Sequence, residues 1–217
     1  MNLTRQHELT KNLNLRSPIA IIGCGGIGSW TALSLAKLGF TDITLFDDDT
    51  VDEENIPSQC YSPNQIGKPK VEALHDVLNL MTRTKCKPMN KKFDGGKYRL
   101  AIICVDSMTA RKEIAQMYQK SVFLADHVID ARMAIELGVL RSFDLTNVDR
   151  YLSHLKSDDD SVSEACSNKA IAYTTMLIGS LVAKAVTVYL KTKERVHMDF
   201  SLVENVSFIT HKARNDS

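Results

Sequence analysis

The residues best suited to chemistry lie in one stretch near the amino terminus, "IAIIGCGGIGSWTALSLAKLGFTDITLFDDD" at residues 19–49. Gly23, Gly25 and Gly28 follow an apolar run with the spacing G-x-G-x-x-G. The first glycine permits a tight turn, the second lets a phosphate approach the backbone, and the third allows a helix to pack closely on a strand. Free N–H groups at the start of that helix favour an anion. The pattern predicts a nucleotide site.

An acidic residue follows these glycines at the distance typical of a ribose ligand. Asp47 ends the second apolar run, about 20 residues after Gly28. A carboxylate at this position normally accepts hydrogen bonds from ribose hydroxyls. NAD, FAD and ATP all fit these features, so the residues that follow must separate a redox cofactor from ATP.

Two later segments, "FDDDTVDEENIPSQ" (46–59) and "IGKPKVE" (66–72), resemble the ThiF/MoeB family, bacterial relatives of ubiquitin-activating enzymes. The matching residues are Asp47, Asp49, Val51, Asn55, Gln59, Gly67 and Lys70. "IICVDSMTAR" (102–111) resembles the segment whose strand-end aspartate, here Asp106, helps to hold magnesium in that family. The resemblance covers roughly residues 1–125, and more loosely the segment from Cys166 through the long helix that follows.

The resemblance implies an adenylyltransferase that binds ATP and Mg²⁺. Such an enzyme converts a carboxylate, in this family the C-terminal glycine of a ubiquitin-like or sulfur-carrier protein, to an acyl-adenylate and releases pyrophosphate. Asp47 would then hold the ribose. Gly25, Gly26, Gly28, Asn55, Gln59 and Lys70 are expected to hold the phosphates. The other residues expected to bind ATP are Gly23, Asp49 and Ser58.

The chemistry of ATP agrees with this assignment. Charge develops on the departing pyrophosphate, so a lysine and a magnesium carboxylate are needed, whereas NAD needs neither. Lys70 can supply the positive group, and Asp106, at the carboxyl end of an apolar strand, can supply a hard oxygen ligand. The alternative for Lys70 is a solvated lysine at a helix start. The alternative for Asp106 is an N-cap for the helix that begins near Met108.

The sequence departs from the family pattern at three places. Ser58 stands where the family usually has an arginine, and a serine does not reproduce the planar guanidinium. Arg5, in "LTRQ", resembles the family arginine that enters the ATP site of a partner subunit, which implies a homodimer; otherwise it is a mobile terminal residue. The four zinc cysteines of the family are missing.

Cys166, in "SEACSNKAI", falls where many family members have a cysteine in a crossover loop. There it would capture the activated acyl group or carry sulfur, although the acidic neighbours disfavour a thiolate. Cys24, Cys60 and Cys104 are interpreted as packing residues. Arg132, in "VIDARMAIE", is either a ligand for the incoming carboxylate or a surface arginine at a strand edge.

The composition of the chain argues against nucleic acid and membrane as partners. The chain of 217 residues has 27 basic and 26 acidic side chains, which gives no electrostatic case for nucleic acid or an anionic membrane. Five cysteines and no secretory signal predict a cytoplasmic protein. The apolar segment 170–190 contains Lys184 and several hydroxyl residues, so it is expected to be a core or dimer helix rather than a membrane span.

The order of elements predicts a single α/β domain over residues 1–217. Strands expected at 19–22, 42–46, 85–89 and 100–105 alternate with helices at 26–38, 70–81 and 108–119. This alternation is typical of a doubly wound, mostly parallel Rossmann-like sheet. Residues 1–17 form an N-terminal arm, 18–130 the nucleotide-binding half, and 131–217 the remainder.

The second half is expected to contain antiparallel strands. A further strand is expected at 121–124 or 128–130, then a hairpin centred on Gly138, a loop at 156–164, a helix at 170–190 and closing strands within 196–210.

Two other function classes stay open. The first is an NAD-dependent oxidoreductase or cyclase, for which the sequence offers no convincing proton-transfer residue beside the nucleotide site. The second is an ATP-binding partner protein without catalytic activity, which Ser58 and the missing zinc cysteines favour.

Overall fold

The computed structural model describes residues 2–157, 171–203 and 206–211. It contains one eight-stranded sheet in the order β3-β2-β1-β4-β5-β6-β7-β8. The strands are β1 (Ile19–Ile22), β2 (Ile43–Asp47), β3 (Lys87–Asn90), β4 (Gly96–Ile103), β5 (Phe123–Ala134), β6 (Leu137–Phe143), β7 (His197–Ser201) and β8 (Ser207–His211). Strands β1 to β5 pair in parallel, and β5 to β8 pair antiparallel. The predicted doubly wound α/β sheet with antiparallel strands in the second half is confirmed.

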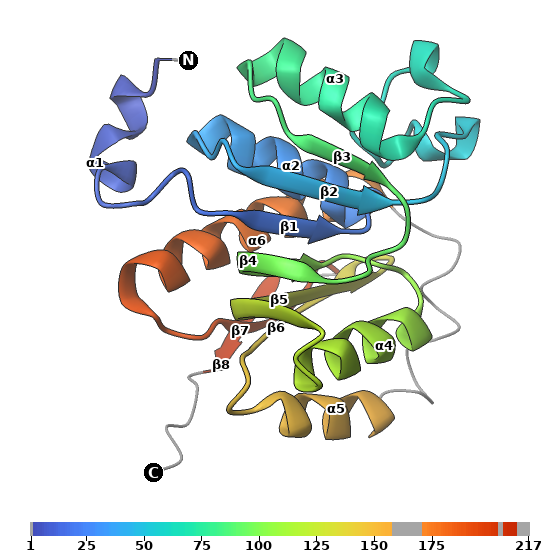
Figure 1. Ribbon diagram of the computed structural model, residues 1–217. Helices are drawn as coiled ribbons and strands as arrows, with labels where there is room; N and C mark the ends of the chain where they lie inside the picture. The colour runs from blue at the N-terminus through green and yellow to red at the C-terminus, as the bar shows by residue number, and fades with distance from the viewer. Residues whose placement is uncertain (1, 158–170, 204–205, 212–217) are drawn as a thin grey trace.

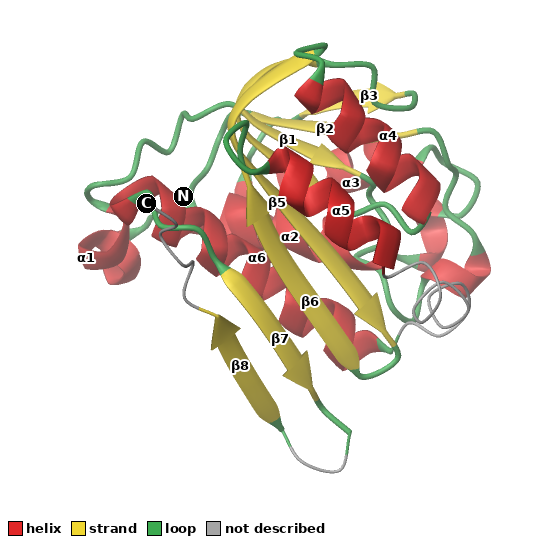
Figure 2. Ribbon diagram, turned by 90° about the horizontal axis from the view of Figure 1, so that it is seen from below, coloured by secondary structure: helices red, strands yellow, loops and turns green. Residues whose placement is uncertain are grey.

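Helices cover both faces of the parallel strands (Figures 1 and 2). They are α1 (His7–Thr10), α2 (Gly26–Leu38), α3 (Lys70–Thr82), α4 (Met108–Gln119), α5 (Val148–Ser157) and α6 (Ala172–Thr192), with short 3-10 turns η1 (Thr4–Gln6), η2 (Glu53–Asn55) and η3 (Pro63–Gln65). Helices α2, α3 and α6 pack on one face, and α4 and α5 on the other.

Strand β1 shows why its sequence is uninterrupted and apolar. Ile19 and Ile21 join the core under α2, α3 and α6, while Ala20 and Ile22 join the core under α4 and α5. Successive side chains of a strand point to opposite faces, so a strand covered on both faces needs apolar residues throughout.

Helix α6 is apolar because it lies against both the sheet and α2. A Cβ on Gly179 would lie 2.6 Å from Cβ of Trp30 and 2.9 Å from the backbone N of Thr31, so the glycine sets how closely the two helices approach. Among the described residues, α6 is the one helix that is long and apolar enough to cross a membrane. Half (50%) of its most apolar 18-residue segment is buried inside the fold.

The structure corrects the expected second half in three respects. The candidate strand at 121–124 overlaps the start of β5 and the one at 128–130 lies inside it, because β5 runs unbroken for 12 residues. The hairpin turn lies at Ile135 and Glu136, and Gly138 sits inside β6, where a Cβ would meet the Phe200 ring at 2.0 Å. Helix α5 was not predicted, although Val148, Tyr151 and Leu155 form a buried helical stripe. The expected loop at 156–164 lies mostly outside the described residues.

A substitution at the contact between α2 and α6 tests this packing. Gly179→Val should lower the free energy of unfolding by about 1–3 kcal/mol, because a side chain forces the two helices apart. The matched control is Ser180→Val, the same new side chain on the exposed neighbour, which should change stability by less than about 0.5 kcal/mol. Urea denaturation measures both, and equal midpoints for the two variants would contradict the assigned contact.

Candidate functional site

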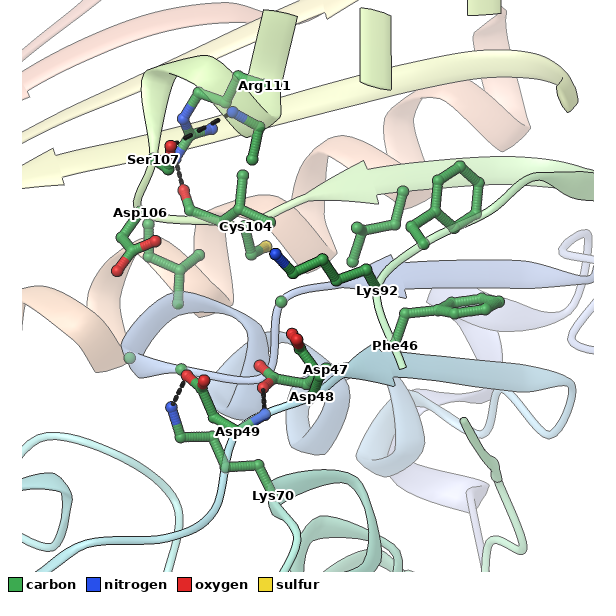
Figure 3. A pocket seen from close by; sticks show the side chains of 18 of the residues that line it. Phe46, Asp47, Asp48, Asp49, Lys70, Lys92, Cys104, Asp106, Ser107 and Arg111 are labelled. Atoms are coloured by element: carbon green, nitrogen blue, oxygen red, sulfur yellow. Dashed lines mark hydrogen bonds and ion pairs between the residues drawn. The ribbon is translucent and has the colours of Figure 1, made fainter. Parts of the chain in front are cut away.

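A cavity of about 1250 Å³ opens at the carboxyl ends of the parallel strands. Its walls come from the turn after β1, the acidic segment after β2, the start of α3, the connection from β4 to α4, and the end of β5 (Figure 3). Open α/β sheets place ligands in this position, where the strand order reverses.

The three glycines of the turn have different surroundings. Gly23 has a φ of +93°, and a Cβ there would lie 2.9 Å from the backbone of Cys104 and Val105, so the turn lies directly against the end of β4. Gly28 does not line the cavity, and its Cβ would fall 1.9 Å from the Gly23 carbonyl oxygen. Gly25, the N-cap of α2, lines the cavity and has no atom within 4 Å of an added Cβ. The space beside Gly25 therefore belongs to the cavity.

Asp47 fixes this turn to the end of β2. The Cys24 N–H donates to Asp47 Oδ2 at 2.6 Å, and the Asp49 N–H donates to Oδ1 at 2.9 Å. Burial raises the pKa of Asp47 above its ordinary value, although both backbone donors and Lys70 act in the opposite direction. Asp47 thus holds the glycine turn in place and also faces the cavity.

Lys70 begins α3 and is buried at the cavity wall, where its Nζ lies 2.7 Å from Asp49 Oδ2 (Figure 3). Burial lowers the pKa of Lys70, but the hydrogen bond to Asp49 and the charge of Asp47 outweigh it, so the pKa is raised. The ammonium is therefore charged at neutral pH. The alternative of a solvated lysine at the helix start is wrong.

The segment after β2 brings three more predicted residues to the cavity: Asn55, Ser58 and Gln59. Ser58 is buried, and its carbonyl accepts hydrogen bonds from Trp30 Nε1 at 3.0 Å and Thr175 Oγ1 at 2.7 Å. Gln59 Oε1 is buried without a hydrogen-bond partner among the residues that the structure describes. An unpaired buried acceptor in a cavity wall suits a ligand that donates a hydrogen bond.

Asp106 follows β4 and is exposed to the cavity (Figure 3). Ser107 caps α4 instead, since its Oγ accepts the Ala110 N–H at 3.3 Å. The alternative interpretation of Asp106 as the helix cap is therefore wrong. Its carboxylate is left for a ligand in the cavity.

Arg5 does not join this site within its own chain. Arg5 is exposed in η1, beside α1 at the amino ends of the strands, and does not line the cavity of its own chain (Figure 1). Cys166 lies outside the described residues.

Sequence reasoning missed several cavity residues. Lys91, Lys92 and Phe93 come from the segment after β3, and Arg111 comes from the first turn of α4. Their position after parallel strands was the available signal, because such segments meet at one edge of the sheet.

Arg132 is buried beside Asp130, so its interpretation as a surface arginine is wrong.

The cysteines of the described residues are all buried. Burial raises the pKa of Cys60 to about 11 and the pKa values of Cys86 and Cys104 to about 12, and raises the pKa of Cys24 well above its ordinary value. The interpretation of Cys24, Cys60 and Cys104 as packing residues agrees with this burial.

The model of the ThiF family matches residues 4–215. The chain belongs to the ThiF family.

Curated relatives cover only part of the chain. Ubiquitin-like modifier-activating enzyme 5 of Caenorhabditis briggsae is 30% identical over 133 residues, which is 52% of this chain and 30% of the relative. The enzyme of the same name from Caenorhabditis elegans is 33% identical over 115 residues, or 44% of this chain and 27% of the relative. This chain thus matches less than a third of the length of these relatives.

Solved structures share the fold at low sequence identity. Escherichia coli MccB with ATP aligns with a TM-score of 0.70 and 14% identity, covering 94% of this chain and 66% of MccB. MccB with AMPCPP and MccA gives a TM-score of 0.69 at 15% identity, covering 94% of this chain and 65% of MccB. PaaA gives 0.69 at 19% identity, with coverage of 94% and 66%.

The buried thiols give a direct test of the site. In a Cys166→Ala variant, Cys24, Cys60, Cys86 and Cys104 should all fail to react with an aromatic disulfide reagent at pH 8, because buried thiols with raised pKa values carry little thiolate. All should react after denaturation. Rapid reaction of any of them in the folded variant would contradict their assigned burial.

Proposed function

We propose that the protein binds MgATP and adenylates a carboxylate, the C-terminal glycine of a ubiquitin-like or sulfur-carrier protein or of a peptide. The observation that carries this proposal is the meeting of the glycine turn, Lys70 and Asp106 in one cavity. Attack at the α-phosphate of ATP requires a phosphate cradle, a cation for the leaving pyrophosphate and a magnesium ligand. Membership of the ThiF family and the ATP-bound MccB structures support the same assignment.

Each side chain then has a role in holding ATP. The Asp47 carboxylate accepts hydrogen bonds from the ribose, and the N–H groups at Gly25 and Gly26 face the phosphates at the start of α2. The Lys70 ammonium and the side-chain N–H groups of Asn55 and Gln59 donate to the triphosphate, and Gln59 Oε1 accepts from a hydroxyl or N–H group of the ligand. The phosphates compete with Asp49 for the Lys70 ammonium, because the ammonium donates to Asp49 in the structure without ligand.

The residues present fit a magnesium ion. Asp106 offers a carboxylate that is exposed to the cavity and does not cap α4, and Mg²⁺ prefers such hard oxygen ligands. The ion, when bound, neutralises charge on the phosphates.

The chain contributes mainly positioning and charge. A carboxylate oxygen of the substrate forms a bond to the α-phosphorus, and the bond between that phosphorus and the bridging oxygen breaks, so its electron pair leaves with pyrophosphate. No general base is needed, because the carboxylate is already deprotonated at neutral pH. Lys70 stabilises the charge that grows on pyrophosphate. A thiol such as Cys166 can act only after the adenylate exists.

We also propose a homodimer in which Arg5 enters the ATP site of the partner. Arg5 lies away from the cavity of its own chain. Ser58 occupies the position where the family usually has an arginine, and it brings no positive charge to the cavity. The exposed face of α6, with Tyr173 and Met176 about half exposed, is consistent with burial against a second copy.

ATP–pyrophosphate exchange dependent on a Gly-Gly-terminated substrate tests the adenylation. Asp106→Ala should reduce exchange at least about a hundredfold, equivalent to roughly 2.7 kcal/mol of barrier, because magnesium binding is lost. Cys166→Ala is the control and should stay within a few-fold of wild type. Normal exchange by Asp106→Ala together with loss in Cys166→Ala would refute the assignment.

Mixing two inactive variants tests Arg5. Arg5→Ala and Lys70→Ala should each lose exchange, and their mixture should recover about a quarter of the wild-type activity, because half of the random dimers carry one intact composite site. A monomer in sedimentation, or no recovery on mixing, would rule out the proposed action in the partner site.

A further inference from the structure

A cluster of buried charges lies on the wall of the cavity formed by β5 and α4. Arg111 is 3% exposed, Asp130 is fully buried and Arg132 is 7% exposed. Arg111 Nη1 donates to Asp130 Oδ1, and Arg132 Nε donates to Asp130 Oδ2 at 2.6 Å. These three side chains carry two positive charges and one negative charge. Desolvating charges costs several kcal/mol per ion, so such a cluster is weak evidence for stability and points to another task.

The cluster lies where the proposed adenylation would take place. Arg111 and Arg132 both line the cavity. Ile103 of β4 pairs with Asp130 of β5, so Arg132 lies two residues beyond the end of β4, beside the segment that leads to Asp106. The next residue, Met133, packs on the opposite face, where its Cε would lie 3.8 Å from a Cβ on Gly26. The end of β5 therefore passes close to the glycine turn.

The two arginines differ in their contacts. Arg111 Nη1 donates to Asp130, and Nη2 donates to the Val105 carbonyl. Arg111 therefore links the Asp130 carboxylate to the β4–α4 connection. Arg132 Nε donates to Asp130, and its guanidinium lies 5.9 Å from the centre of the Tyr151 ring. The two arginines hold the pKa of Asp130 below its ordinary value against the effect of burial, so this anchor stays ionised.

The position also fits the direction of attack. Figure 3 shows Lys70 and Asp49 on one side of the glycine turn, and Arg111 and Ser107 on the other. In phosphoryl and nucleotidyl transfer the attacking and leaving oxygens lie roughly in line. If pyrophosphate is held at Lys70, in-line attack would bring the carboxylate from the side of Arg111, which pairs with the same Asp130 as Arg132. A planar guanidinium matches a carboxylate in shape and charge.

We propose that Arg132 binds the C-terminal carboxylate of the substrate before it attacks ATP, and that Asp130 and Arg111 position its guanidinium. This inference rests on the proposed function and adds the residue that selects a free carboxylate. Arg132 exchanges no proton in the step. Its attraction for the substrate falls once the carboxylate has become an uncharged acyl group on the adenylate.

The test compares two synthetic peptides ending in Gly-Gly, one with a free carboxylate and one with a C-terminal amide. Each is titrated calorimetrically into protein saturated with Mg²⁺ and AMPCPP. Wild type should bind the carboxylate peptide at least about tenfold more tightly than the amide. Arg132→Gln should abolish that preference, and Arg132→Lys should retain part of it because the charge remains without the planar fork.

The controls separate this inference from the proposed function. Arg195→Gln removes another partly buried arginine, paired with Asp144 away from the cavity, and should keep the full carboxylate preference. AMPCPP affinity should be the same in Arg132→Gln and wild type. The urea midpoint should fall, because the fully buried Asp130 keeps only Arg111 as a charged partner. A retained preference in Arg132→Gln, equal binding of the two peptides by wild type, or a parallel loss of AMPCPP affinity in Arg132→Gln would overturn the role of Arg132. Failure of wild type to bind AMPCPP would overturn the proposed function instead.

Discussion

The hydrogen bond from the Cys24 N–H to the Asp47 carboxylate is the constraint on which the site depends. It joins the glycine turn to the end of β2, while Gly23 brings the same turn against the end of β4. The start of α2 is therefore fixed between two strands, with Gly25 facing open space. A preorganised phosphate site needs this rigidity, because donors that are already aligned need no reorganisation when charge develops.

Positively charged residues lie on both sides of the glycine turn. Asp47, Asp49 and Lys70 lie on the β2 and α3 side, and Arg111 lies on the α4 side (Figure 3). Arg132 lines the cavity from the end of β5. Two anionic reactants, a triphosphate and a carboxylate, must approach each other in the proposed reaction. Cations on opposite sides of the turn would hold them apart until one oxygen of the carboxylate reaches the α-phosphorus. Asp130 and Asp49 keep these cations oriented before a ligand arrives.

Local sequence signals were sufficient for the first half of the fold. The bounds of β1 and α2 follow from apolar runs and from Gly39 with its φ of +101°, which are features of neighbouring residues. The start of α4 was predicted, but its cap is Ser107 and not Asp106. The second half depends on long-range contacts, since the unbroken β5 and the turn at Ile135 are set by pairing with β6. The buried Asp130–Arg132 pair could not be predicted, because a charged residue at a strand end reads as exposed until its partner is known.

The most direct test of the central claim is the affinity of Gly25→Ala for MgATP. The added methyl group meets no protein atom within 4 Å and fills only the space assigned to phosphates. Titration calorimetry should show at least about tenfold weaker MgATP binding, roughly 1.4 kcal/mol, with an unchanged urea midpoint, and no binding of NAD⁺ by wild type. Wild-type affinity for MgATP in Gly25→Ala, or tight binding of NAD⁺, would contradict the account.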